Sequence, residues 1–143
     1  MLATLLISAS GSVILALGLV HLLYTFVGTK LLPRDEALLT AMQAAAPNLT
    51  RKTTMWRAWI GFNASHSNGA ILFGLVYGYL ALAHASFLFQ SRFLLLVGLA
   101  MLVGYVFLAK LYWFSIPLRG IALATALYFA ALVVNQASTG GLQ

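Results

Sequence analysis

The second long apolar segment of this chain opens with Trp59-Ile60-Gly61-Phe62-Asn63-Ala64-Ser65-His66-Ser67-Asn68-Gly69. Two amides, two hydroxyls and an imidazole thus precede the apolar residues that continue to Ala83. A segment of this length crosses a hydrocarbon core of about 30 Å. An unpaired polar group in such a medium costs about 2 to 7 kcal/mol, so these groups must meet other helices, water or a ligand. The stretch therefore predicts a membrane span that carries a polar site.

The composition assigns the whole chain to the membrane. Of its 143 residues, 62% are hydrophobic and 7% are charged, whereas soluble domains carry about 25% charged residues. The first apolar segment is too long for the h-region of a signal peptide, so we expect it to be retained. We predict an all-α fold, a single domain of residues 1–143 built as an up-down bundle of four transmembrane helices. The predicted spans are residues 2–27, 59–83, 93–114 and 116–134.

The connection between the first two spans predicts one further helix, over residues 34–47. Pro33 precedes it, Asp35 and Glu36 suit the positive end of a helix dipole, and Leu38 shares an apolar face with Met42. We expect this amphipathic helix to lie on the cytoplasmic surface of the membrane.

The basic residues predict the orientation of the bundle. Seven of the eight fall on one side of the predicted spans, in or beside the 28–58 connection and the short 114–116 connection. Only Arg92 falls on the other side. Because cytoplasmic loops carry the excess of Lys and Arg, both termini are predicted to lie outside the cytoplasm. The positive net charge of +6 is thus explained by lipid and orientation, and we expect no nucleic-acid partner.

Small residues at four-residue spacing predict close helix packing. Gly61, Ser65 and Gly69 follow this spacing in the second span, and Ala122 and Ala126 follow it in the fourth. Such residues let backbones approach each other where lipid removes the hydrophobic drive for association.

Two histidines are predicted to meet inside the bundle. His21 lies seven residues before Gly28 and His66 seven residues after Trp59, so a rise of about 1.5 Å per residue puts both about 10 Å below the same membrane surface. Each span carries further polar residues on the same side. The predicted ligand-binding residues are His21, Thr25, Asn63, His66 and Ser67, with Tyr105, Lys110 and Arg119 from the last two spans.

The chemistry of these residues leaves several functions open. A neutral histidine bonded to Asn63 or Ser67 is the purely structural interpretation. Haem held axially by His21 and His66 is one cofactor possibility, and a quinone is another. The chain has no cysteine, and its only carboxylates are Asp35 and Glu36, which leaves too few ligands for a non-haem metal site. Ser65 and His66 are adjacent and point about 100° apart on a helix, so they do not form a nucleophile and base in contact.

The segments His21-Leu22-Leu23-Tyr24-Thr25-Phe26, Pro33-Arg34-Asp35 and Thr54 to Ser67 resemble an uncharacterised family of small bacterial four-span integral membrane proteins. The resemblance covers the first half of the chain, and the second half only in hydropathy. It implies the fold and the membrane placement. Together with the orientation predicted from the basic residues, this gives the bacterial inner membrane with periplasmic termini as the expected location. The resemblance implies no activity.

We therefore expect a small accessory subunit or ligand-binding bundle. Its polar residues would engage the headgroup of a lipid, a quinone-like molecule, a pigment or haem, and its partners would be membrane lipid and a larger membrane complex or further copies of the chain. One alternative is a membrane isomerase or oxidoreductase with His66 or His21 as proton carrier and Asn63 holding an oxyanion. Another is a proton-conducting or transport bundle, which the missing intramembrane carboxylates disfavour.

Overall fold

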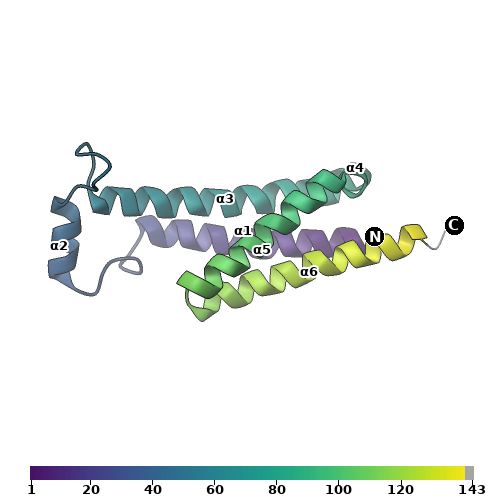
Figure 1. Ribbon diagram of the computed structural model, residues 1–143. Coiled ribbons are helices and arrows are strands. Elements are labelled where there is room, and N and C mark those ends of the chain that lie inside the picture. Colours follow the sequence, from purple (N-terminus) through teal and green to yellow (C-terminus); the bar gives the residue numbers. More distant parts are fainter. Residues whose placement is uncertain (141–143) are drawn as a thin grey trace. The chain divides into compact units, whose positions relative to one another are not determined.

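The computed structural model describes residues 1–140, except for the side chains of residues 139 and 140. Within this range all the regular secondary structure is helical, with no strand (Figure 1). The all-α class is therefore confirmed. The predicted single domain also includes residues 141–143, which lie outside the described residues. The helices are α1 (Leu2–Phe26), α2 (Glu36–Ala44), α3 (Met55–Ala83), α4 (Ala85–Gln90), α5 (Arg92–Tyr112) and α6 (Ser115–Gly140).

Three helices of the described chain are long and apolar enough to cross a membrane, namely α1, α5 and α6. These three agree with the first, third and fourth predicted spans, and they make the chain consistent with an integral membrane protein. At 29 residues α3 is longer than any of them, but the polar residues of its first half lower its mean hydropathy.

Several helix boundaries differ from the predicted ones. The interfacial helix is only Glu36–Ala44 instead of 34–47, because Asp35 caps its start by accepting from the Ala37 N–H at 2.8 Å and the backbone is already extended at Ala45. α3 starts four residues before the predicted 59, where the Thr54 hydroxyl accepts from the Arg57 N–H. The last helix continues past the predicted residue 134. The predicted end was placed where the apolar residues stop, but the polar residues that follow are also helical.

The bounds of two further helices also differ slightly from the predicted ones. The third predicted span, 93–114, is α5 over Arg92–Tyr112, which Ser91 caps by accepting from the Leu94 N–H at 3.3 Å. The first helix ends at Phe26, one residue before the predicted 27. α4 lies between the second and third predicted spans, where no helix was predicted, since six residues are too few to show a helical period.

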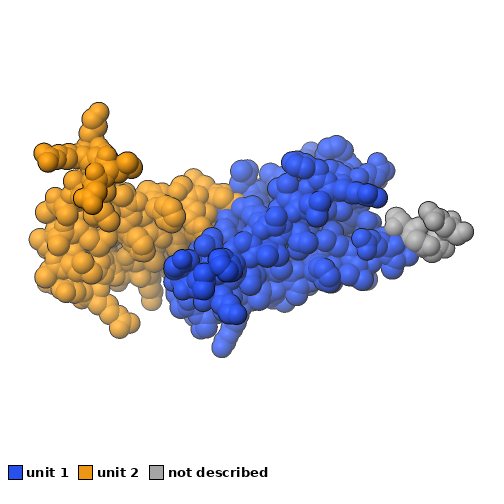
Figure 2. All heavy atoms as spheres, in the orientation of Figure 1, with its two compact units in different colours: residues 1–17, 70–143 blue, residues 18–69 orange. Residues whose placement is uncertain are grey.

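The chain divides into two compact units (Figure 2). Unit 1 comprises Met1–Leu17 and the described residues from Ala70 onward, and unit 2 comprises Gly18–Gly69. The first part of α1 and the last part of α3 therefore belong to unit 1, and the remaining parts of these two helices belong to unit 2.

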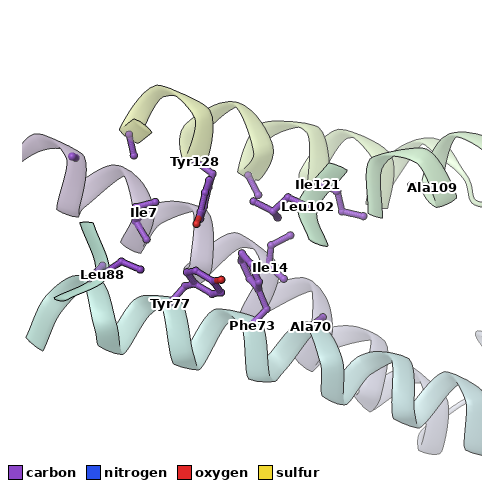
Figure 3. Close-up of a cluster of buried hydrophobic side chains, with 14 residues drawn as sticks. Ile7, Ile14, Ala70, Phe73, Tyr77, Leu88, Leu102, Ala109, Ile121 and Tyr128 are labelled. Atoms are coloured by element: carbon purple, nitrogen blue, oxygen red, sulfur yellow. The ribbon is translucent and has the colours of Figure 1, made fainter. Parts of the chain in front are cut away.

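The core of unit 1 is built around two tyrosines (Figure 3). The Tyr77 hydroxyl donates to the Leu94 carbonyl at 2.7 Å, and the Tyr128 hydroxyl donates to the Leu95 carbonyl at 3.1 Å. The two rings meet edge to face with centroids 5.8 Å apart. A Cβ at Gly98 would collide with the Tyr128 hydroxyl and come within 2.7 Å of the Tyr77 ring. Only glycine therefore lets both tyrosines reach the backbone of α5.

Close helix packing occurs in unit 1, but not at all the predicted small residues. A Cβ on Gly74 would lie 2.6 Å from the Gly11 carbonyl oxygen. On α6, however, Ala122 and Ala126 are exposed, and the buried residues are Ile121, Ala124, Tyr128 and Ala131. A strict four-residue spacing drifts by about 40° around a helix at each step. A packed face therefore alternates steps of three and four residues.

Candidate functional site

Five of the predicted site residues lie in unit 2, where the last turns of α1 and the first turns of α3 run side by side (Figure 1). We call this group the polar cluster: His21 and Thr25 from α1, and Asn63, His66 and Ser67 from α3. The cluster contains no charged side chain.

The centre of the polar cluster is a hydrogen bond between His21 and Asn63. The Nε2 atom of His21 lies 3.0 Å from Oδ1 of Asn63. The amide nitrogen of Asn63 donates to the Trp59 carbonyl at 2.8 Å, so the amide orientation is set by the helix itself. Because Oδ1 only accepts, the proton of this bond belongs to Nε2 of His21. A neutral His21 therefore keeps an acceptor lone pair on Nδ1.

His66 lies directly beside His21. The two ring centroids are 5.6 Å apart and the ring planes are nearly perpendicular, at 88°. The predicted proximity of the two imidazoles is thus confirmed, while their role as ligands stays a prediction. Both side chains are half-buried, whereas Asn63 is buried.

The hydroxyls of the polar cluster bond back to their own helices. Thr25 donates to the His21 carbonyl at 2.8 Å, and Ser67 donates to the Asn63 carbonyl at 2.9 Å. Each hydroxyl has then used its single proton and retains only acceptor capacity. Ser67 is fully buried and Thr25 nearly so. Neither hydroxyl of the polar cluster therefore has a proton left to donate to a ligand.

Trp59 is a residue of this region whose role the sequence did not reveal. Its indole N–H donates to the Leu31 carbonyl at 3.3 Å, and its own carbonyl accepts from Asn63. The sequence pattern indicated only an interfacial aromatic residue. The four-residue spacing from Trp59 to Asn63 was the available signal, because an Asn side chain in a helix reaches the carbonyl one turn earlier.

Two polar residues of the Trp59 to Gly69 segment lie outside the polar cluster. Ser65 and Asn68 are exposed on α3, and the Ser65 hydroxyl donates to the Phe62 carbonyl at 3.0 Å. The helical period turns these two residues away from Asn63 and Ser67.

The other predicted ligands belong to unit 1. Tyr105 is half-buried, with its ring centroid 6.5 Å from that of Trp113. Lys110 and Arg119 are exposed, at the end of α5 and the start of α6. Their membership of one site with the polar cluster stays a prediction.

The arrangement of the His21 and His66 rings limits which cofactors they can bind. Axial haem ligation needs one nitrogen on each side of the macrocycle, but the rings of His21 and His66 stand edge to face and Nε2 of His21 already binds Asn63. The arrangement suits a hydrogen-bonded headgroup better than a macrocycle between the rings. Within residues 1–140, no three His, Cys, Asp or Glu side chains gather as a metal site would require.

Comparisons with known protein families, with curated proteins and with solved structures each gave no match for this chain.

Proposed function

We propose that this chain is a four-span membrane protein whose polar cluster binds the polar headgroup of a membrane amphiphile, and that it serves as an accessory, non-catalytic subunit. In this proposal α3 is the fourth span. Large apolar side chains are exposed along α3 as along the other long helices, for example Leu72, Leu75 and Leu82. A surface of this kind favours contact with lipid chains.

The observation that carries the proposal is the partial exposure of the His21 imidazole. This ring would lie about 10 Å inside the membrane surface in this arrangement. Its exposed part would be costly against hydrocarbon, so a polar partner is expected to cover it. Asn63 already orients this ring, which is the preorganisation that a binding site needs.

The hydrogen-bond inventory favours a ligand that donates. The Nδ1 lone pair of a neutral His21 accepts and belongs to a ring that is only half-buried, whereas the hydroxyl protons of the buried Thr25 and Ser67 are already used. A headgroup with hydroxyls, such as a hydroquinone or a polyol lipid, would donate to this nitrogen. We propose hydroxylated amphiphiles as the ligand class.

The same donor-acceptor pattern weakens the enzymatic alternative. Of the two N–H groups of the Asn63 amide, one is committed to the Trp59 carbonyl, and the amide oxygen faces His21, which leaves at most one donor for an oxyanion. An oxyanion hole requires free donors aimed at the developing charge.

The orientation is part of the proposal. We propose that the chain lies in the bacterial inner membrane with periplasmic termini, and the seven basic residues on one side of the predicted spans support this orientation.

The test is native purification into polymer nanodiscs, followed by mass spectrometry of bound lipids and proteins. We expect one hydroxylated amphiphile to be enriched over the bulk membrane, and a stoichiometric partner protein to accompany the chain. Asn63→Leu should lower that enrichment about tenfold or more, while Asn68→Leu, an exposed amide on the same helix, should not. A lipid composition equal to the bulk membrane would refute the binding site, and a Soret band lost in His21→Ala would establish haem instead.

A further inference from the structure

The short helix α2 has an apolar side that the chain itself does not cover. None of its nine residues is buried by the described part of the chain, and Leu38 is 50% exposed. Helices this short are marginal in water without packing. Some other surface must therefore cover the exposed Leu38, whereas Leu39 and Met42 are already partly buried.

The position of α2 in unit 2 restricts what that surface is. In Figure 1, α2 lies across the ends of α1 and α3 that belong to the same unit. Two hydrogen bonds tie the connection to the start of α3. The Trp59 indole donates to the Leu31 carbonyl, and the Met55 N–H donates to the Ala45 carbonyl at 2.8 Å. In the four-span arrangement proposed above, on which this inference rests, α1 and α3 both cross the membrane. A helix held across their ends therefore lies in the plane of the membrane surface.

The charges around α2 are mainly positive. Residues 28–57, which we call the basic surface, contain five cations against two anions, and all seven side chains are exposed. One of the anions, Asp35, is occupied as the helix cap. The cations are Lys30, Arg34, Arg51, Lys52 and Arg57.

We propose that the basic surface binds anionic lipid headgroups, with α2 lying in the interface and Leu38 directed into the acyl region. Apolar residues on a short helix beside clustered cations form the combination that anionic membrane surfaces attract. The occupant is the bilayer, and an acidic protein partner is the competing possibility that the experiment separates. This inference is independent of the polar cluster, because no residue of the basic surface belongs to the polar cluster.

The first experiment uses the absence of cysteine in the chain. Leu38→Cys carries an environment-sensitive fluorophore, and Thr40→Cys, which a helix turns about 200° away, is the control. The full chain is placed in nanodiscs of phosphatidylcholine with or without 30% phosphatidylglycerol. We expect a blue shift for the label at position 38 that is larger with the anionic lipid, and a small shift at position 40. Equal spectra in both lipids would overturn the proposal.

The second experiment measures lipid selectivity. In mixed nanodiscs the anionic lipid retained by the full chain is counted by native mass spectrometry. Replacing Arg51 and Lys52 with Gln should reduce the preference about fivefold for each cation removed, and high salt should reduce it in the wild-type chain. The control, Arg92→Gln, removes one cation outside the basic surface and should change little compared with Arg51→Gln alone.

Two further results would contradict the inference. One is an unchanged preference in the Arg51 and Lys52 variant whose circular dichroism equals that of the wild type. The other is a fluorophore at position 38 whose emission shifts to the blue when an acidic peptide is added, but not when anionic lipid is present.

Discussion

The imidazole of His21 and the side-chain amide of Asn63 are joined across two helices at 3.0 Å, and the same amide is anchored to the Trp59 carbonyl. Asn63 thus acts as a bridge between α1 and α3 in unit 2. Its position decides which nitrogen of His21 carries the proton, and therefore what the ring offers to a ligand.

Removing this bridge should destabilise the protein. Asn63→Leu leaves a polar imidazole without its acceptor, which costs about 1 to 3 kcal/mol. Thermal unfolding in detergent measures the loss. Asn68→Leu, which changes an exposed amide on the same helix, should stay within about 0.5 kcal/mol of the wild type. If both variants unfold at the same temperature, the bridge contributes nothing.

Gly98 should resist replacement by alanine. The added Cβ meets the Tyr128 hydroxyl and the Tyr77 ring, and overpacking of this kind costs about 1 to 3 kcal/mol. Gly104 lies on the same helix with no described atom within 4 Å of an added Cβ. Gly104→Ala should therefore be neutral or stabilising by up to about 1 kcal/mol, since alanine is the better helix former. Chemical unfolding of both variants tests the contrast, which a loss of equal size would disprove.

Gly74→Ala should be at least as harmful as Gly98→Ala. The new Cβ would approach the Gly11 carbonyl oxygen and the Leu15 Cβ, each at 2.6 Å, and backbone atoms cannot rotate away as side chains do. Gly78, one turn further on α3, has open space. We expect the yield of folded Gly74→Ala to fall sharply and that of Gly78→Ala to match the wild type. A well-folded Gly74→Ala would show that the helices of unit 1 pack less closely.

Ser10 should contribute a measurable interhelical hydrogen bond. Its hydroxyl is buried and donates to the Ala124 carbonyl of α6 at 2.8 Å. Bonds of this kind between membrane helices average about 0.6 kcal/mol. Ser10→Ala should lower the unfolding free energy by about that amount, and Ser12→Ala, at an exposed position two residues on, should not. A larger effect at Ser12 would contradict the assignment.

The local properties of the chain follow from the order of its residues alone. Long apolar runs with few charges have few alternatives to helices in a membrane, because a backbone in hydrocarbon must bond internally. The proximity of His21 and His66 also followed from local information. Each lies seven residues from a recognisable end of its predicted span, and the helical rise per residue converts this equal spacing into an equal depth.

The interhelical details were not predictable in this way. The packed face of α6 runs through Tyr128 and Ala131, while the spacing rule pointed to Ala122 and Ala126. In a segment that is apolar on every side, hydropathy does not distinguish the lipid-facing side from the packed side. The six-residue α4 and the early start of α3 depend on capping and short-range contacts that a hydropathy window averages away.

The sequence by itself determined that the chain is helical and apolar enough for a membrane, and which polar residues interrupt the apolar segments, because these properties depend on neighbours along one chain. Tertiary structure alone decided that Asn63 binds His21, that Trp59 anchors the connection through Leu31, and that Gly98 makes room for two tyrosines. Those outcomes depend on how helices rotate and approach each other, and contacts between residues distant in sequence set that rotation.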